Sequence, residues 1–413
     1  MEKKYIIDTE ENKKFLEDVR NGIFDFGHSF PSPDGSSYWL DTDGTPCYDK
    51  PRETFITCRM AHVYSMGTFL GHEGSAELAA KAITGLREGP LHDSENGGWH
   101  NKIDSEGKPL PDKLCYAHAF VMLAGTSGLL AGIEGSRELL EEGMETYDKY
   151  YWNEEEGLSC DIWNTEFTVK DEYRGLNANM HTVEAFLAVA DTLAREDYRK
   201  RAGRIIDHVV EWGAKNNWRL PEHYKSDWTI DLDFHKDTPD DPFKPYGATP
   251  GHGCEWARLI SQWALSTFKT KEAAQKYITV SENLFLRAAE DAWNVDGAPG
   301  MVYTTDFEGK PIVRERMHWV LAEAIDTAGM LYRITGKDIY ADYYAQFMEY
   351  LDKYMLDHTY GNWYHQMDEN NKVMGTVWPG KMDLYHAMQA TLIPYYPSDK
   401  SICLAVKERA KQQ

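Results

Sequence analysis

A short aromatic-rich pattern recurs along this chain of 413 residues and limits the folds that are open to it. In each copy a Gly or Asn stands six positions before an Asp, Trp or Tyr lies between them, and a turn sequence follows. Such an alternating stretch followed by a Gly- or Asn-containing turn predicts a β-hairpin. The four clear copies span residues 35–41, 98–104, 300–306 and 362–368.

The spacing of the copies predicts how many there are. The Asp positions 41, 104, 306 and 368 are separated by 63, 202 and 62 residues, and the long gap is close to three times 67. We therefore expect two degenerate copies inside it, near Trp163 and Trp228. Six units of roughly 65 residues then account for nearly the whole chain, as in a repeat architecture.

Amphipathic stretches alternate with the hairpins and predict two kinds of helix. Charged stretches, typical of outer helices, precede the hairpins, and more apolar stretches, typical of inner helices, follow them. The expected outer helices span 10–27, 74–88, 136–150, 197–213, 271–291 and 337–355. The expected inner helices span 52–71, 114–132, 179–194, 252–268, 315–335 and 383–393. This order predicts an all-α (α/α)₆ barrel with short β-hairpins at one end, as a single domain over residues 1–413, with an open α-solenoid as the alternative.

The composition of the chain limits the classes of molecule that it is expected to bind. The formal net charge of −23 argues against binding nucleic acid or an anionic membrane surface. The sequence has no run of 18 apolar residues, so no membrane span is predicted, and the first residues lack the apolar stretch of a secretory leader. The six cysteines are scattered and form no C-x-x-C pair, so we expect a cytoplasmic protein. Abundant aromatic residues suit a carbohydrate site, because a ring stacks on the C–H face of a sugar.

Polar residues in the first turns of the expected inner helices mark the candidate site. Polar groups are rare in cores unless they are satisfied or functional. Because all six inner helices enter from the same end, these side chains should converge there. They are Arg59, His62, Tyr116, His118, His181, Glu184, His252, Glu255, His318, Trp319, Glu323, Asp383 and His386.

Individual members of this set favour different interpretations. For His62 and His118 we favour satisfied core histidines, and Asp383 is suited to capping a helix. For His252 and His386 the functional interpretation leads. His252 follows the Pro-Gly corner of YGATPGHGCEW, and His386 lies one turn after Asp383 in WPGKMDLYH.

The set excludes several reaction classes. The sequence has no G-x-S-x-G, no P-loop, and no G-x-G-x-x-G in a strand–helix setting. A metal site at His181/Glu184 or His252/Glu255 is disfavoured, so we expect no metal and no cofactor. Two chemistries stay open at this point. One is glycoside hydrolysis by Glu255, Glu323 or Asp383, and the other is proton transfer beside a sugar carbonyl with histidines as acid and base.

The chain resembles the N-acylglucosamine 2-epimerase family, in particular its bacterial aldose–ketose isomerase branch. The resemblance runs from about residue 20 to 395. The stretches that carry it are FITCRMAHVYS, ENGGWH, EYRGLNANMHTVEAFL, YGATPGHGCEW, EGKPIVRERMHW and VWPGKMDLYH.

The resemblance implies an (α/α)₆ barrel and a cofactor-independent isomerisation of a monosaccharide through a cis-enediol. It implies that His386 moves the proton between C2 and C1, that His252 assists ring opening and oxygen proton transfer, and that Arg59 stabilises the enediolate. The order of the two histidine roles is open. The residues implied to bind the sugar are Tyr116, Asn177, His181, Glu255, Trp319, Glu323, Gln366 and Asp383.

Substrate choice rests on two positions. Sulfoquinovose-type members of the family carry an Arg and a Gln where this chain has Pro242 and Met382, with Lys244 and Lys381 nearby. We therefore expect a neutral aldose, D-mannose converted to D-fructose, with D-lyxose and D-xylulose as a second pair. Alternatives are a sulfoquinovose isomerase, a sugar 2-epimerase, a glycoside hydrolase and a non-catalytic binding protein. Homo-oligomerisation is left open, and the 217–250 segment is a candidate lid.

Overall fold

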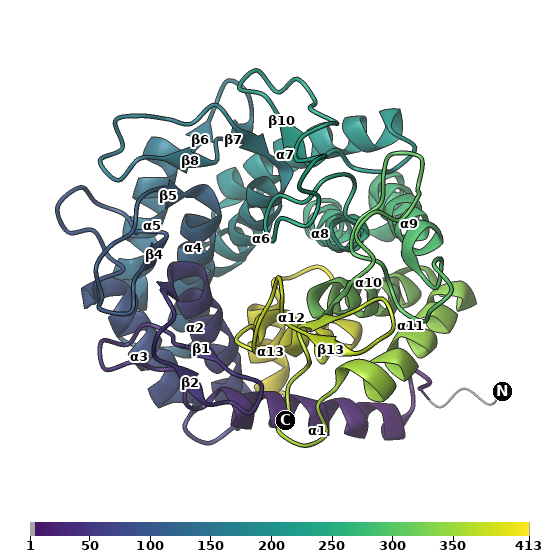
Figure 1. Ribbon diagram of the computed structural model, residues 1–413, viewed down its shortest axis with the longest axis horizontal. Helices are drawn as coiled ribbons and strands as arrows, with labels where there is room; N and C mark the ends of the chain where they lie inside the picture. Colours follow the sequence, from purple (N-terminus) through teal and green to yellow (C-terminus); the bar gives the residue numbers. More distant parts are fainter. Residues whose placement is uncertain (1–4, 413) are drawn as a thin grey trace.

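The protein is a closed ring of helices in two concentric layers, seen in the computed structural model, which describes residues 5–412 (Figure 1). This is the expected (α/α)₆ barrel. The inner helices are α2 (Thr54–Phe69), α4 (Cys115–Ala131), α6 (Leu176–Leu193), α8 (Pro250–Phe268), α10 (His318–Thr335) and α12 (Tyr385–Ala390). The outer helices are α1 (Glu10–Gly27), α3 (Ser75–Glu88), α5 (Ser136–Tyr150), α7 (Glu196–Lys215), α9 (Lys271–Ala292) and α11 (Asp338–Tyr350).

The two layers differ in burial as their composition predicts. The inner helix α4 is buried from Cys115 to Gly128 apart from Tyr116, whereas α5 and α7 bury only one face. Helix ends follow local rules: Thr270 caps α9 by accepting from the N–H of Ala273 at 3.3 Å, and α10 ends at Gly336 in the left-handed conformation.

The sixth unit departs from the expected ranges. Its inner helix, predicted over 383–393, is shortened to Tyr385–Ala390 and continues as a 3₁₀ turn at Ile393–Tyr395. Pro394 lacks the N–H that a longer α-helix would need. The outer helix α11 ends in a π-helical turn, Leu351–Met355.

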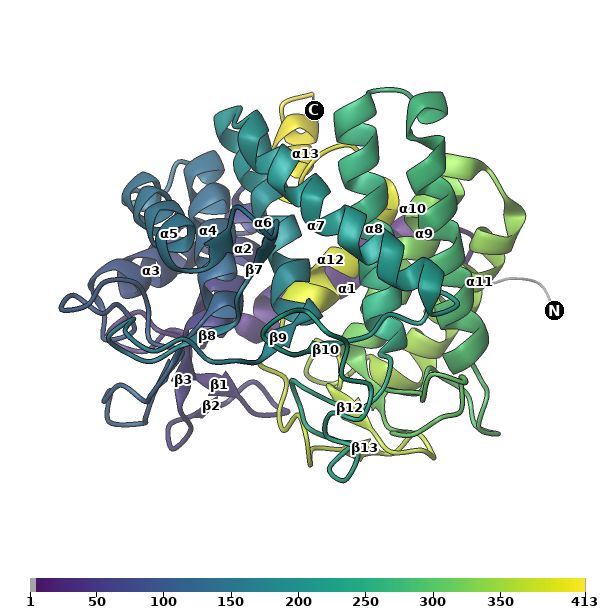
Figure 2. The same ribbon diagram turned by 90° about the horizontal axis from the view of Figure 1, so that it is seen from above.

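An additional C-terminal helix, α13 (Ile402–Ala410), was not predicted from the sequence. It packs on α2 and α4 at the end of the ring opposite to most of the short strands (Figure 2). Lys407 donates from Nζ to the carbonyl of Leu130, and the N–H of Ser401 donates to Asp191. This helix therefore covers the far end of the barrel.

All six expected hairpin turns are present, including the two degenerate ones. In four of them the left-handed position holds Gly44, Gly107, Gly309 or Asn371, with φ from 61° to 89°. In the degenerate copies that position is held by Phe167 and Trp228, with φ of 55° and 63°. Those two turns therefore lack the Gly or Asn that marks the other four in the sequence, although the backbone adopts the same left-handed conformation.

The strands are only two residues long, and several join one unit to the next. Hairpins on one end of a closed ring lie side by side, so a strand leading into one inner helix pairs with the hairpin of the next unit. The antiparallel pairs are β1 (Trp39–Leu40) with β2 (Pro46–Cys47), β3 (Arg52–Glu53) with β4 (Lys102–Ile103), β5 (Lys113–Leu114) with β8 (Ile162–Trp163), β6 (Trp152–Asn153) with β7 (Leu158–Ser159), β9 (Arg174–Gly175) with β10 (His223–Tyr224), and β12 (Gln366–Met367) with both β11 (Arg316–Met317) and β13 (Val373–Met374).

No helix within residues 5–412 is long and apolar enough to cross a membrane.

Candidate active site

One cavity opens where the first turns of the inner helices converge, on the hairpin end of the ring. It contains about 480 Å³ of empty space, part of which is open to solvent. Its lining residues are Arg59, Tyr116, Asn177, His181, Pro242, Phe243, Pro245, His252, Glu255, Tyr303, His318, Trp319, Trp378, Asp383 and His386.

The structure brings His252 and His386 together in this cavity. His252 lies in the first turn of α8, which begins at Pro250, and His386 lies in the first turn of α12. Both imidazoles face the same indole ring, because the Trp319 centroid is 5.0 Å from that of His252 and 5.9 Å from that of His386. The two histidines therefore flank one small space.

Each of these histidines is held by a buried glutamate. The Nδ1 atom of His252 lies 3.0 Å from Glu222 Oε1, and the Nδ1 atom of His386 lies 3.0 Å from Glu323 Oε1. A carboxylate on Nδ1 fixes the tautomer and ring orientation, so that Nε2 is left for the ligand. Both rings are thus oriented to exchange protons with a bound molecule.

A second group surrounds Asp383 on the same side of the cavity. Asp383 Oδ2 lies 3.1 Å from both Arg59 Nη1 and His318 Nε2, and 3.9 Å from His386 Nε2. Burial alone would raise the pKa of Asp383, but Arg59 and the histidines hold it well below its ordinary value. Arg59 also donates to the Tyr116 hydroxyl at 2.8 Å, which fixes the guanidinium at the cavity wall.

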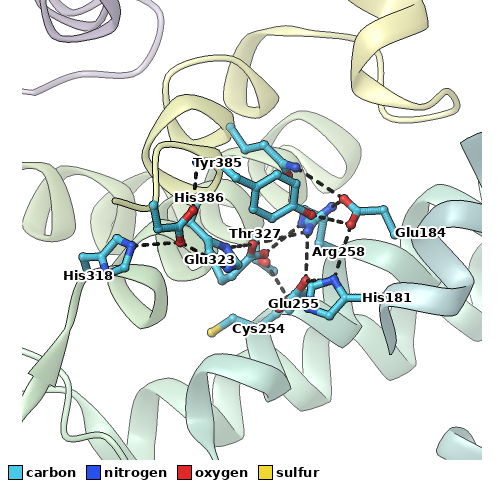
Figure 3. Close-up of polar contacts among 12 residues, drawn as sticks. His181, Glu184, Cys254, Glu255, Arg258, His318, Glu323, Thr327, Tyr385 and His386 are labelled. Carbon is cyan, nitrogen blue, oxygen red and sulfur yellow. Dashed lines mark hydrogen bonds and ion pairs between the residues drawn. The ribbon is translucent and has the colours of Figure 1, made fainter. Parts of the chain in front are cut away.

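Arg258 connects three buried carboxyl groups beneath the cavity, as Figure 3 shows. Its Nε donates to Glu323 at 2.9 Å, and its terminal nitrogens lie 3.5 Å from Glu255 and 3.7 Å from Glu184. Tyr385 donates its hydroxyl to Glu184. This layer supports the cavity floor from inside the barrel.

The carboxyl groups around Arg258 do not share one charge state. Burial favours the neutral form of each, but Arg258 and His386 lower the pKa of Glu323, and His181 and Arg258 lower that of Glu184. Burial and the neighbouring Glu323 raise the pKa of Glu255 well above its ordinary value. A neutral Glu255 at the cavity wall is able to donate a hydrogen bond to a ligand oxygen.

The other predicted sugar-binding residues fall into two groups. Tyr116, Asn177, His181, Glu255, Trp319 and Asp383 line the cavity. Gln366 and Glu323 do not. Gln366 is fully buried behind the wall, where its side-chain oxygen accepts from the N–H groups of Val377 and Trp378. It therefore fixes the loop that carries Trp378, and Glu323 acts through His386.

His62 and His118 are core residues, as expected. The His62 Nδ1 atom lies 2.7 Å from the Ser127 hydroxyl, and burial lowers the pKa of His62 to about 4. His118 accepts from the N–H of Trp99 at 3.1 Å, and burial lowers its pKa to about 3. Neither residue lines the cavity.

Sequence reasoning missed Glu222 and the aromatic wall residues Phe243, Tyr303 and Trp378. Glu222 lies thirty positions before its partner His252 and outside any inner helix, so no helical spacing relates the two. The aromatic residues stand on loops. Only the high aromatic content of the chain pointed to such walls, without indicating which rings supply them.

The 217–250 segment forms part of the cavity wall through Pro242, Phe243 and Pro245. The Phe243 ring packs edge-on against Trp378, with centroids 5.2 Å apart, and against Phe55 at 5.9 Å. These rings bring two distant loops together at the cavity mouth. Whether the segment moves as a lid stays a prediction.

Two residues of the cavity wall, His181 and Glu255, form a trio with metal-ligand spacing together with Glu184 beneath it. The candidate ligand atoms of His181, Glu184 and Glu255 lie within 4.8 Å of one another. Arg258 already contacts both carboxyl groups, and burial lowers the pKa of His181 to about 4. A guanidinium beside two of three ligands opposes a cation there by charge repulsion. These residues therefore do not suit a metal ion.

The amino-acid sequence matches a known family and is similar to named isomerases. The family model described as N-acylglucosamine 2-epimerase (GlcNAc 2-epimerase) matches residues 35–390. A D-mannose isomerase of Thermobifida fusca is 37% identical over 398 residues, covering 96% of this chain and 97% of that protein. A D-mannose isomerase of Pseudomonas cannabina pv. alisalensis is 38% identical over 370 residues, covering 89% of each.

Solved structures resemble the same ring. A D-mannose isomerase crystal structure has a TM-score of 0.85 at 28% identity, covering 92% of this chain and 97% of its own. Cellobiose 2-epimerase from Spirochaeta thermophila has a TM-score of 0.77 at 17% identity, with 98% and 99% covered, and supports the fold alone. The family match across the barrel, together with relatives above 30% identity along nearly the whole chain, shows that this protein belongs to the N-acylglucosamine 2-epimerase family.

Proposed function

We propose that this protein is an aldose–ketose isomerase that interconverts D-mannose and D-fructose. The observation that carries the proposal is the pair of glutamate-held imidazoles, His252 and His386, on either side of Trp319 in one sugar-sized cavity. The named activity of the relatives at 37% and 38% identity supports the choice of mannose.

The reaction requires two proton movements, for which the cavity offers two groups. His386 removes the proton from C2 of the open-chain aldose, which gives a cis-enediol, and returns a proton to C1. During ring opening His252 transfers the hydroxyl proton of O1 to the ring oxygen O5, and during isomerisation it carries the hydroxyl proton from O2 to O1. Proton transfer by positioned histidines contributes about 10²–10⁴-fold to such a rate.

The negative charge of the intermediate needs a fixed cation. Arg59 supplies it, since its guanidinium is anchored by Asp383 and Tyr116 at the cavity wall. Pre-oriented donors stabilise a developing oxyanion without reorganising during the reaction. Glu255 and His181 would bind the remaining hydroxyl groups. The Trp319 indole would lie against the C–H face of the sugar.

The surroundings favour a neutral sugar over a sulfonated one. Pro242 lines the cavity and offers no charge, and Met382 is fully buried. Lys381 is bound to Asp357 at 2.6 Å in the protein interior, and Lys244 lies over the Tyr173 ring at 4.0 Å in a neighbouring cavity. A sulfonate would therefore lack the charged fork that recognises it best.

The competing functions are supported less well. A glycoside hydrolase needs two carboxyl groups free to flank a glycosidic bond. Glu323 and Asp383 are instead tied to Arg258 and Arg59, which leaves Glu255 without a matched partner. A 2-epimerase would use the same residues, and it differs only in the carbon and face that receive the proton.

Incubation of the purified protein with D-mannose in D₂O tests the proposal. We expect D-fructose, identified by chromatography and NMR, with no loss of rate in EDTA. Glucose as the product would indicate the epimerase, and reducing sugar released from oligosaccharides without exchange at C2 would indicate the hydrolase. Binding without turnover of any aldose, D-lyxose included, would leave only a binding protein.

A reducing compartment such as the cytosol is part of the proposal. All six cysteines are free, and five of them are buried in the structure. The monosaccharide is the only partner the proposal requires, and homo-oligomerisation stays a prediction.

A further inference from the structure

A group of three metal-binding side chains lies outside the sugar cavity, close to the end of α2. Asp25 belongs to α1, His28 follows that helix as its C-cap, and His72 lies in the turn between α2 and α3. One candidate ligand atom from each lies within 4.8 Å of the other two. None of the three takes part in the proposed reaction.

The geometry of His72 is that of a prepared ligand. Its Nδ1 atom lies 3.0 Å from the Ser75 hydroxyl, and its ring stacks on Phe24 with centroids 4.5 Å apart and planes at 22°. When Nδ1 donates to that hydroxyl, the Nε2 lone pair faces Asp25 and is available to a metal. The His72 side chain is 13% exposed, so the stacking holds it in place while Nε2 stays accessible.

The distances fit a tetrahedral ion. His72 Nε2 lies 3.3 Å from Asp25 Oδ1. With metal–ligand bonds of about 2.0–2.2 Å, two ligands of a tetrahedral zinc ion lie about 3.3–3.5 Å apart. The His28 ring contacts the His72 ring edge-on, with centroids 5.3 Å apart, and makes no side-chain hydrogen bond with the rest of residues 5–412. It is exposed and able to turn the remaining distance.

We propose that Asp25, His28 and His72 form a surface site for Zn²⁺ or a similar imidazole-binding divalent cation. Two imidazoles and a carboxylate supply three ligands, and water completes the tetrahedron. The contrast with His181, Glu184 and Glu255 supports the assignment. That buried trio has the same spacing but is contacted by Arg258, whereas no Lys or Arg within residues 5–412 forms an ion pair with Asp25.

The position of the site predicts what the ion does. Helix α1 closes the ring, because Asn12 near its start donates to Tyr344 of α11, while the Phe24 carbonyl near its end accepts from Tyr64 of α2 (Figure 1). An ion held by Asp25, His28 and His72 would fasten the end of α1 to the α2–α3 turn. We infer that the metal stabilises the closed ring by holding this end of α1, whose other end contacts α11, against the α2–α3 turn.

Calorimetric titration of the metal-stripped full-length protein with ZnCl₂ tests the site. We expect one Zn²⁺ per chain in the wild type, and affinity lowered by at least about tenfold in His28→Gln and in His72→Gln. His208→Gln is the matched control, since it removes another surface histidine whose Nε2 binds only the Glu156 carbonyl. That variant, and His181→Gln in the buried trio, should bind zinc as the wild type does.

Thermal unfolding separates the clamp from incidental binding. Zinc should raise the Tm of the wild type and of His208→Gln and leave that of His28→Gln and His72→Gln unchanged, each compared with the same variant without metal. The exposed variant His28→Gln should unfold like the wild type when no metal is present. Equal zinc affinity in the wild type and His28→Gln, or loss of binding in His181→Gln alone, would overturn the proposal. The test does not depend on the proposed isomerase activity, because its readouts are binding and stability.

Discussion

On each side of the cavity a glutamate carboxylate contacts the Nδ1 atom of a histidine, but the two pairs have different surroundings. We call the side of the cavity at His386, on α12, the inner wall, and the side at His252, on α8, the outer wall. On the inner wall, Glu323 lies 3.0 Å from His386 and 2.9 Å from Arg258 in the fully buried centre of the barrel. On the outer wall, Glu222 holds His252 at the same distance and forms no ion pair with a Lys or Arg of the residues that the structure describes.

The two imidazoles therefore differ in their contacts. Glu323 is shared between His386 and Arg258, whereas the Glu222 carboxylate, within residues 5–412, contacts His252 alone. Asp383 Oδ2 also lies 3.9 Å from His386 Nε2. In line with the roles that the family resemblance implies, we expect His386 to act as the base at carbon and His252 as the proton donor to oxygen.

Removal of either imidazole is the change with the largest expected effect. His386→Ala should lower kcat by about 10⁴-fold and stop exchange of the C2 proton with D₂O, because no other base reaches carbon. His252→Ala should lower kcat by about 10²–10³-fold and retain slow exchange at C2. NMR of mannose in D₂O measures both quantities. Exchange kept in His386→Ala and lost in His252→Ala would reverse the assignment.

Replacing the inner glutamate should affect both folding and rate. In Glu323→Gln, Arg258 loses its 2.9 Å carboxylate partner in the interior, and we expect the free energy of unfolding to fall by about 3 kcal/mol. Because His386 then contacts a neutral amide in place of a carboxylate, and the amide also has to satisfy Arg258, kcat should fall by about 100-fold. Urea unfolding and steady-state kinetics provide the measurements. An unchanged unfolding free energy would mean that Glu184 and Glu255 suffice to compensate Arg258.

Replacing the outer glutamate should affect the rate more than the fold. Glu222→Gln keeps a hydrogen bond to His252 but removes the charge, so kcat should fall by about tenfold with KM nearly unchanged. The free energy of unfolding should fall by only about 1 kcal/mol. Steady-state kinetics and urea unfolding provide the two measurements.

Glu222→Asp is the matched variant for this position, because it restores the charge on a shorter side chain. Partial recovery of kcat relative to Glu222→Gln is expected, and steady-state kinetics measures it. Equal kcat values in Glu222→Gln and Glu222→Asp would mean that the charge of Glu222 does not support the reaction, and would remove the distinction between the two walls.

The two sides of the cavity also differ in how well their residues could be predicted from the sequence. The spacing of the hairpins and the two kinds of amphipathic stretch predicted the ring and its inner and outer helices, because both are periodic signals. Glu323 was found for the same reason: it lies one helical turn and a half after His318 on an inner helix. Periodicity also placed His252 and His386 at one end of the barrel.

Glu222 could not be found in this way. It precedes β10 on a connecting loop, and its contact with His252 depends on how β9 and β10 pair across units. Two-residue strands carry no periodic signal. For Gln366 the family resemblance implied contact with the sugar, and the structure adds that its side-chain oxygen accepts from the N–H groups of Val377 and Trp378 behind the cavity wall. Helix α13 was missed because it lies outside the repeat.

The smallest expected effect concerns a carboxyl group behind the outer wall. Asp161 accepts from the N–H of Gly175 at 2.7 Å, next to the strand pair that carries Glu222, and burial raises its pKa to about 7. Between about pH 4 and pH 7 the folded protein therefore binds a proton that the unfolded chain has released. The stability contributed by this proton is complete below about pH 4 and is lost as the pH rises to about 7.

Asp161→Asn should flatten this part of the stability profile by on the order of 1–2 kcal/mol, with little change in kcat at neutral pH. Unfolding in urea at a series of pH values measures it. Asp383→Asn on the inner wall is the control of opposite sign, because a carboxyl group whose pKa is lowered loses its contribution as the pH falls. If both variants changed the stability profile in the same direction, the pKa values of Asp161 and Asp383 would not be shifted in opposite directions by folding.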